Sequence, residues 1–406
     1  MQGTNIHTAF VSTNSITQGE QVANVWKPLY EMFGISILFG YQTFKWGNEA
    51  RDTAAVHCVI VGFTAEKTSS ALRFIFDKDG VKHFAKNISP YLVEMPTVFI
   101  EARSKPLCDV PLMSAGGKPS DGGFLILSEE EYLDLVKREP QAEKYIKKFS
   151  MGNEFINKIP RYCLWLVNCP PNELRDMPLV MKRVAGVKQF REQSKKEATR
   201  KKAATPMLFD EVKMRDGNYI AVPKVSSENR DYIPMGFLSS DTVAGDMLFM
   251  VSDATLYHFG ILTSKIHMAW VETVCGRLKS DYRYSNNIVY NNFPFPNPTP
   301  EQKAAIEEAA QKVLDARALY PEASLADLYD SLRMPPELRK AHNTLDKAVE
   351  KAYGQKFADE SEIVAYLMKE YQRLVSEEGK KKNNLLLSST HSARILLPGN
   401  PQYKSE

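Results

Sequence analysis

Short apolar blocks in the first part of the chain predict a compact α/β unit. Thr8–Val11 and the β-branched run Gly34–Trp46 predict strands, and the nearly continuous apolar run Ala54–Phe63 predicts a strand covered on both faces. Polar residues and then spaced apolar positions over Val22–Tyr30 predict a helix between the first two strands. We expect the last two strands to form a hairpin, and the first to need further strands beside it.

The middle of the chain changes its pattern three times. Lys105–Leu127 is punctuated by Gly and Pro and predicts a surface loop between domains. Ser128–Phe149 predicts a helix, because Ser128 and Glu131 have capping-box spacing and apolar residues recur at helical intervals. Gly152–Val167 ends in an apolar run and predicts a buried strand.

The second half is predicted to be first β-rich and then helical. Residues 207–262 alternate short apolar runs with turns, which is typical of an antiparallel β-domain. Thr263–Cys275 has helical periodicity, and Thr299-Pro300 with Gln302 predicts a capped helix start. At least two further helices are expected before a flexible tail that begins near residue 381.

Composition narrows the class of protein. The 406 residues are 43% hydrophobic with a net charge of only +3, so two or three folded domains are expected, and any nucleic-acid surface must come from local clusters. The five Cys have no metal-site spacing and suggest reduced thiols in the cytoplasm. No apolar stretch is long enough to span a membrane. No metal ligands stand out, because His258 and His267 lack partners at ligand spacing.

Gly276–Pro296 mixes charges, rings and amides in one short ribbon. In an extended strand Lys279 and Asp281 point the same way, so a donor and an acceptor could read both members of one G·C pair. Neighbouring side chains could contact the DNA backbone or support the strand: Arg277, Arg283, Tyr282 and Tyr284. The alternative is a solvated ion-pair ladder of little energetic value.

A second cationic segment covers Met181–Ala204, with nine Lys or Arg against two Glu. It predicts a helix that would carry Lys188, Arg191 and Lys195 on one face. Phosphate contact and an ordinary solvated helix face are about equally supported.

Several sequence segments of the chain resemble those of one known protein family. FVSTNSITQGEQV, GYQTFKWGNEA, AAVHCVIVGF, NEFINKIPRYCLWL, and GRLKSDYRYS followed by IVYNNFPFP resemble the MmeI-like type II restriction-modification enzymes. These fuse a nuclease, an adenine-N6 DNA methyltransferase and a target recognition domain. The resemblance implies an α/β fold: the end of a doubly wound methyltransferase sheet, an α+β target recognition domain and a C-terminal helical bundle. The implied ranges are 1–104, 105–297 and 298–380, with a flexible tail over 381–406.

The resemblance also implies roles for single residues. Positions matching Lys279 and Asp281 carry base choice in that family, so the pair implies a G·C base pair. Double-stranded DNA is the implied partner. Phe44 and Trp46 could stack on a flipped base, although packing within the sheet is the better supported interpretation.

The chain departs from the family where the methylation chemistry is expected. No Gly-x-Gly turn follows a strand, and NCPPN and MPPE lack the order of the Asn-Pro-Pro-Phe motif and are better interpreted as turns. S-adenosylmethionine therefore belongs to the full-length family enzyme, and this chain alone is not expected to catalyse. Three hypotheses remain: a specificity module that needs a missing N-terminal half, an enzyme with an unrecognised site, or a truncated product without function.

Overall fold

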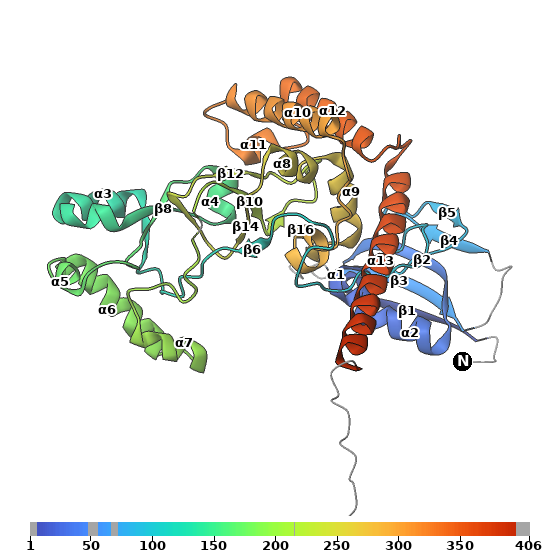
Figure 1. Ribbon diagram of the computed structural model, residues 1–406, viewed down its shortest axis with the longest axis horizontal. Helices are drawn as coiled ribbons and strands as arrows, with labels where there is room; N and C mark the ends of the chain where they lie inside the picture. The colour runs from blue at the N-terminus through green and yellow to red at the C-terminus, as the bar shows by residue number, and fades with distance from the viewer. Residues whose placement is uncertain (1–5, 48–55, 66–71, 215, 395–406) are drawn as a thin grey trace, which may run out of the picture.

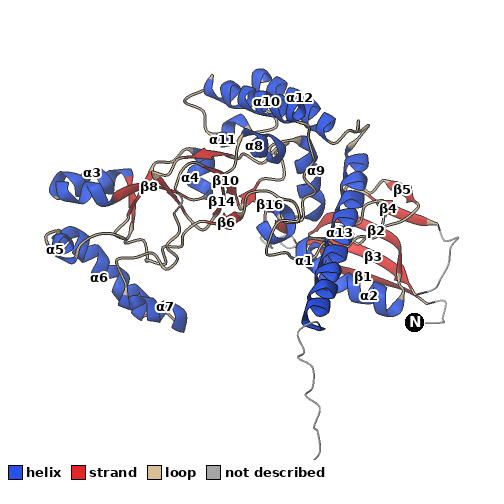
Figure 2. Ribbon diagram, viewed as in Figure 1, coloured by secondary structure: helices blue, strands red, loops and turns tan. Residues whose placement is uncertain are grey.

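The computed structural model describes residues 6–47, 56–65, 72–214 and 216–394 of the chain, with side chains up to Lys381. Figure 1 shows an elongated molecule with a sheet at one end, a lobe with helical arms at the other, and a layer of helices above the centre. Figure 2 shows that the strands form separate sheets along this length. Residues 54–55 of the third predicted strand, and the last part of the predicted tail, lie outside the described residues.

The sheet at one end confirms the predicted hairpin. Its strand order is β1-β3-β2-β4-β5. The strands span the following residues: β1 His7–Thr13, β2 Ser36–Trp46, β3 Val56–Thr64, β4 Arg73–Phe76 and β5 Lys82–Ala85. β2 and β3 pair antiparallel, as do β1 and β3, whereas β2 and β4 are parallel. Among the described residues, β1 is therefore an edge strand of this sheet.

The helical segment between β1 and β2 packs on this sheet. It consists of short turns at Asn14–Thr17 and α1 (Gly19–Gln21), a π-helical turn at Val22–Trp26, and α2 (Lys27–Phe33). Trp26 is buried, and its ring packs edge-on against Phe63 of β3 at 5.8 Å. This packing explains why the apolar positions recur at helical spacing.

The centre of the molecule is β-rich, as predicted, but its last segment is helical. A second sheet has the order β12-β10-β14-β6. Its strands are β6 Met113–Ala115, β10 Tyr219–Pro223, β12 Gly236–Leu238 and β14 Leu248–Ser252. Residues 256–262 belong instead to helix α8 (Leu256–Leu262), where Thr255 and His258 form a capping box. α9 (Lys265–Val274) confirms the helix predicted over 263–275.

We call residues 119–210 together with strand β13 (Thr242–Ala244) the distal lobe. Its sheet has the order β13-β8-β9-β7, and its helices other than α4 form the arms at the left of Figure 1, whereas α4 lies next to β10. The elements are β7 Ile126–Ser128, α3 Glu129–Arg138, β8 Ile146–Ser150, α4 Gly152–Asn157, β9 Arg161–Leu164, α5 Pro171–Arg175, α6 Pro178–Glu192 and α7 Glu197–Lys201. The lobe has an apolar core of its own. Lys118 and Glu211, at its two ends, exchange both backbone hydrogen bonds at 3.0 and 3.1 Å.

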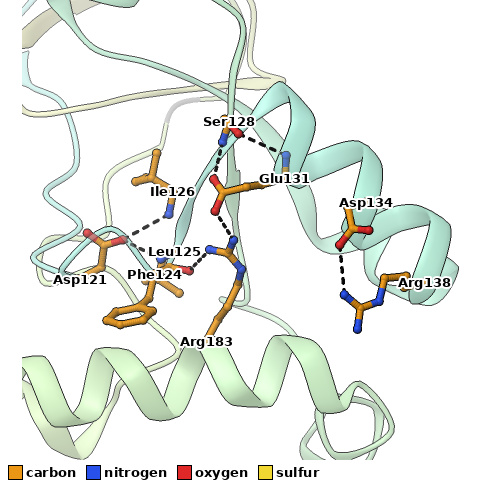
Figure 3. Close-up of polar contacts among 9 residues, drawn as sticks. All are labelled: Asp121, Phe124, Leu125, Ile126, Ser128, Glu131, Asp134, Arg138 and Arg183. Carbon is orange, nitrogen blue, oxygen red and sulfur yellow. Dashed lines mark hydrogen bonds and ion pairs between the residues drawn. The ribbon is translucent and has the colours of Figure 1, made fainter.

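The capping box predicted at Ser128 is present. The Ser128 hydroxyl accepts from the amide of Glu131, whose carboxylate accepts from the Ser128 amide (Figure 3). The predicted helix over Ser128–Phe149 is nevertheless too long. Pro140 lacks the backbone N–H that a continuing helix needs, so the helix ends at Arg138 and the last part becomes strand β8.

The C-terminal part is helical, as expected. The helices are α10 Pro300–Ala318, α11 Leu325–Leu328, α12 Pro336–Ala352 and α13 Glu360–Arg394. Thr299 and Gln302 form the predicted capping box of α10. α13 continues to Arg394, where the sequence predicted a flexible tail from residue 381; residues 395–406 lie outside the described part. None of the helices in the described ranges is both long and apolar enough to cross a membrane.

One apolar core joins these parts. A single buried cluster runs from Val22 and Val61 of the first sheet region through Trp270 of α9 to Leu345 and Leu367 of the C-terminal helices. The core is thus continuous across residues 104 and 297, while the distal lobe has a second core and joins the central sheet through a small cluster that includes Ala244 of β13 and Phe155 of α4.

Candidate nucleic-acid interface

The ribbon singled out in the sequence is a β-hairpin. Strands β15 (Gly276–Leu278) and β16 (Asp281–Arg283) pair antiparallel, and Lys279 and Ser280 form the turn between them. We call residues 276–283 the recognition hairpin. Helix α9 leads directly into it, and β16 pairs on its other side with β11 (Val225–Ser226).

The expectation of one extended strand through Lys279 and Asp281 is therefore wrong. Lys279 has a φ of +59°, and the chain reverses immediately after it, whereas Asp281 begins the returning strand opposite Leu278. The two side chains consequently do not lie in the i, i+2 row of one strand. Both are still at the tip, where Lys279 is exposed and Asp281 is half-buried.

The two tyrosines of this segment support the hairpin from below. Tyr282 and Tyr284 are buried, and the Tyr284 hydroxyl lies 3.0 Å from Nε2 of the buried His267. Burial lowers the pKa of His267 to about 3, which keeps this imidazole neutral. These residues belong to the core, in agreement with the predicted structural role of His267.

Arg277 and Arg283 have different surroundings. Arg283 is exposed on the returning strand. The Arg277 guanidinium lies 3.8 Å from the centre of the Tyr282 ring and donates to the backbone carbonyls of Ser280 and Glu272, both at 3.3 Å. The two arginines therefore do not form the continuous row that was expected.

Two further ionisable groups near the hairpin had no signal in the sequence. Burial lowers the pKa of Arg230, and the nearby carboxylates of Asp281 and Asp330 partly oppose this effect. Burial, together with a hydrogen bond to Glu360, raises the pKa of the Glu272 carboxyl to about 8. Arg230 approaches the hairpin from another part of the chain, and Glu272, on α9 just before the hairpin, meets its distant partner Glu360 of α13, so sequence spacing could not reveal either environment.

The hairpin is tied to the first sheet region. Gly19 has a φ of +54°, and a Cβ placed on it would lie 3.3 Å from the Cα of Gly276. The side-chain amide of Asn287 donates to the Glu20 carboxylate at 2.5 Å. The segment after β1, Asn14–Thr17, contains no glycine.

Phe44 lies in a cavity between the sheet and the hairpin. This cavity has a volume of about 1020 Å³, and its lining includes Phe44, Arg277, Ser280 and Glu360. Trp46 is 50% exposed, and its ring centre is 6.2 Å from that of Phe44. The structure thus brings Phe44 next to the hairpin, while neither ring is fully buried in the sheet.

The cationic segment forms two helices rather than one. α6 ends at Glu192 and α7 begins at Glu197, so Lys195 lies between them and does not share a helical face with Lys188. Both lysines are exposed. Arg183 of α6 is bound within the lobe, where it donates to the Phe124 carbonyl and the Glu131 carboxylate (Figure 3).

Arg191 is not available to phosphate. Its side chain is fully buried, and burial lowers its pKa. The guanidinium donates to the backbone carbonyls of five residues at 2.7–3.0 Å: Pro119, Ser120, Lys202, Thr205 and Leu208. All five donor positions are used, so the predicted backbone-contact role is corrected to a structural one.

The two Pro-Pro segments begin helices. Pro171 is the first residue of α5 and Pro336 is the first residue of α12. Among the described residues no group of three or more His, Cys, Asp or Glu side chains is placed to hold a metal ion.

The comparisons with family models place the chain in a class: DNA methyltransferase-type proteins that carry a target recognition domain. The family model for the MmeI target recognition domain matches residues 94–297, that for the MmeI C-terminal domain matches 298–377, and that for the MmeI DNA-methyltransferase domain matches 1–77. The chain belongs to the MmeI family of restriction-modification DNA methyltransferases.

Two relatives illustrate the match. DNA methyltransferase A of Bacillus subtilis (strain 168) is 44% identical over 372 residues, which cover 91% of this chain and 42% of that protein. The structure of the type IIL restriction-modification enzyme MmeI in complex with DNA is 43% identical, with a TM-score of 0.87, and the match covers 92% of this chain and 50% of that one. The chain thus spans half or less of the length of these relatives.

Proposed function

We propose that this chain is the sequence-reading part of an adenine-N6 DNA methyltransferase of the restriction-modification type, and that the recognition hairpin contacts the bases. The observation that carries this proposal is the position of Lys279 and Asp281 at the tip of a hairpin whose base is fixed by buried tyrosines. A two-stranded β-ribbon fits the major groove, where Lys donates to guanine and Asp accepts from cytosine. Duplex DNA in the cytoplasm is the proposed partner.

The hairpin geometry still suits one G·C pair. Lys279 extends from the turn and Asp281 from the adjoining strand end, so the donor and acceptor approach the groove from neighbouring backbone positions. Arg283, Lys188 and Lys195 are exposed cations that could contact phosphates. Phe44 and Trp46 remain candidates for stacking on an extruded base, since both are accessible and Phe44 lines the cavity beside the hairpin.

The test is selection of bound duplexes from a random pool. The double variant Lys279→Glu with Asp281→Arg should select a different base pair at one position and leave the others unchanged. Lys195→Glu is the matched control, because it alters an exposed charge away from the hairpin and should weaken all duplexes alike. An unchanged selected sequence in the double variant would show that the hairpin does not read this pair.

We infer that methylation requires more protein than this chain. S-adenosylmethionine is the methyl donor in the full-length family enzyme, and the Gly-rich turn that would hold it is expected in the N-terminal half. Between β1 and β2 this chain has Gly19 and Gly34, and Gly19 packs against Gly276 instead of facing an open cradle. A calorimetric titration should detect no binding of S-adenosylmethionine to the chain alone, and measurable binding would contradict the inference.

The proposed partner for catalysis is the N-terminal methyltransferase half. β1 lies at the edge of its sheet, and Phe10 and Val11 on it are about half exposed, as expected for a strand that accepts a neighbour. Adding a separately produced N-terminal half from a longer relative should restore methylation of adenine. Val11→Asp should weaken that association, while Lys195→Glu should not. Under this proposal, the chain takes part in methylation only when it is combined with the N-terminal half.

A further inference from the structure

The side chain of Arg277 is held by contacts inside the recognition hairpin. Arg277 lies opposite Tyr282 in the strand pairing, and its guanidinium covers that ring at 3.8 Å. One terminal nitrogen donates to the carbonyl of Ser280 in the turn, and the other donates to the carbonyl of Glu272 near the end of α9. A single planar group thus joins the turn, the returning strand and the helix.

The turn needs such a contact because its backbone is unfavourable. Lys279 has a φ of +59°, a left-handed conformation that non-glycine residues adopt uncommonly and at an energetic cost. A residue in this conformation persists only when its surroundings hold it. The hydrogen bond from Arg277 to Ser280 fixes the residue that follows Lys279 and precedes Asp281.

The same contacts make the Arg277 guanidinium less available to bind a DNA phosphate. A guanidinium that stacks on a buried ring and donates to two carbonyls has most of its polar contacts within the protein, even though the half-buried side chain also lines the cavity. Arg283, on the paired strand, is exposed and offers the contrasting case. Arg277 pairs with Tyr282 and Arg283 pairs with Gly276, so the two arginines lie at neighbouring positions on the two strands of the hairpin and form a natural pair for comparison.

We propose that Arg277 is a specificity-positioning residue: it fixes the recognition turn so that Lys279 and Asp281 present one defined arrangement to a base pair, and it does not contact phosphate. This inference rests on the proposed function of the hairpin. A lysine cannot replace it, because an ammonium group lacks the planar fork that spans two carbonyls and stacks on a ring.

The first test needs no DNA. Hydrogen exchange of residues 276–284 is measured in the wild type, Arg277→Met, Arg277→Lys and Arg283→Met. Both Arg277 variants should exchange faster in the hairpin, with exchange elsewhere unchanged, and Arg283→Met should match the wild type. Unchanged exchange in Arg277→Met and Arg277→Lys would overturn the proposal.

The second test separates positioning from phosphate contact. Affinity for the selected duplex, and for duplexes changed at the position read by the hairpin, is measured over a range of salt concentrations. One lost phosphate contact should reduce the slope of log K against log salt by about 0.9, which is the expected result for Arg283→Met. Arg277→Met and Arg277→Lys should keep the wild-type slope but lose about tenfold in base discrimination. A reduced slope with intact discrimination would overturn the proposal.

The charge-swapped double variant at Lys279 and Asp281 is measured in parallel. If it leaves base preference unchanged, the proposed base-reading function fails. If it shifts the preference while Arg277→Met retains full discrimination, the base-reading function stands and the positioning role of Arg277 fails. The two failures are therefore distinguishable in one set of measurements.

Discussion

Replacing Arg191 by Met should loosen one end of the distal lobe. The guanidinium donates five hydrogen bonds to backbone carbonyls in two segments, residues 119–120 and 202–208. Met fills a similar volume but donates none of them. At about 1 kcal/mol net for each bond, the upper limit is about 5 kcal/mol; relaxation and rehydration of some carbonyls reduce the expected loss to about 3–4 kcal/mol.

Hydrogen exchange measures this loss locally. The amides of Lys118, Leu208 and Glu211 are hydrogen-bonded within the affected segments. Their exchange should accelerate by about two to three orders of magnitude in Arg191→Met, since about 1.4 kcal/mol corresponds to a factor of ten. Arg191→Lys should give a smaller effect, because an ammonium group retains three donors instead of five.

Lys188→Met is the matched control for Arg191→Met. Lys188 lies one turn away on α6, is exposed and has only a 3.9 Å ion pair with Glu192, so its loss should change stability by less than about 0.5 kcal/mol. Unchanged exchange in Arg191→Met, combined with a reduced salt dependence of DNA binding, would refute the reasoning and return Arg191 to phosphate contact.

Three further outcomes are expected. Gly19→Ala should lower the melting temperature and disturb the recognition hairpin, because the new Cβ meets Gly276 at 3.3 Å in a left-handed backbone; Gly34→Ala is the control, with a similar φ and open space. The folded protein keeps the Glu272 proton up to about pH 8, whereas an unfolded Glu releases it near pH 4.5. The free energy of unfolding should therefore fall as pH rises through this window, by at most about 1.4 kcal/mol per pH unit, and urea titrations of Glu272→Gln should lack this contribution. Lys195→Met should reduce the salt slope of DNA binding by about 0.9 without changing the selected sequence, and an unchanged slope would assign it to solvent.

The sequence predicted the structural features that depend on residues close together in the chain. The capping boxes at Ser128 and Thr299 could be found because their partners lie three residues away. The β2–β3 hairpin followed from two apolar runs with a short polar loop. The strand sequence around Lys279 was misleading, because its alternation of charges continues through the turn and no Gly or Asn marks the reversal.

Contacts between residues far apart in the chain could not be predicted from the sequence pattern. Arg191 looked like its exposed neighbours because its carbonyl partners lie 11 to 72 residues away, and backbone carbonyls leave no trace in a side-chain pattern. The same applies to Glu272 and Glu360, which meet only after α9 and α13 pack together. Burial of charged groups depends on tertiary packing. The sequence could not predict which charged side chains are buried, and its assignment of Arg191 to the candidate site was therefore wrong.

The two ends of the distal lobe lie next to each other, which affects how segments can be exchanged between homologous proteins. Because Lys118 and Glu211 are bridged by two hydrogen bonds, residues 119–210 leave and re-enter the central body at one point. A segment with coincident ends can be exchanged between homologues as a cassette if it keeps its contacts with the central body. β8 pairs with β13, Val243 of β13 completes the lobe core, and Phe155 of α4 packs against the central sheet. Chimeras joined at residues 104 or 297 would instead divide the one core that the rest of the chain shares.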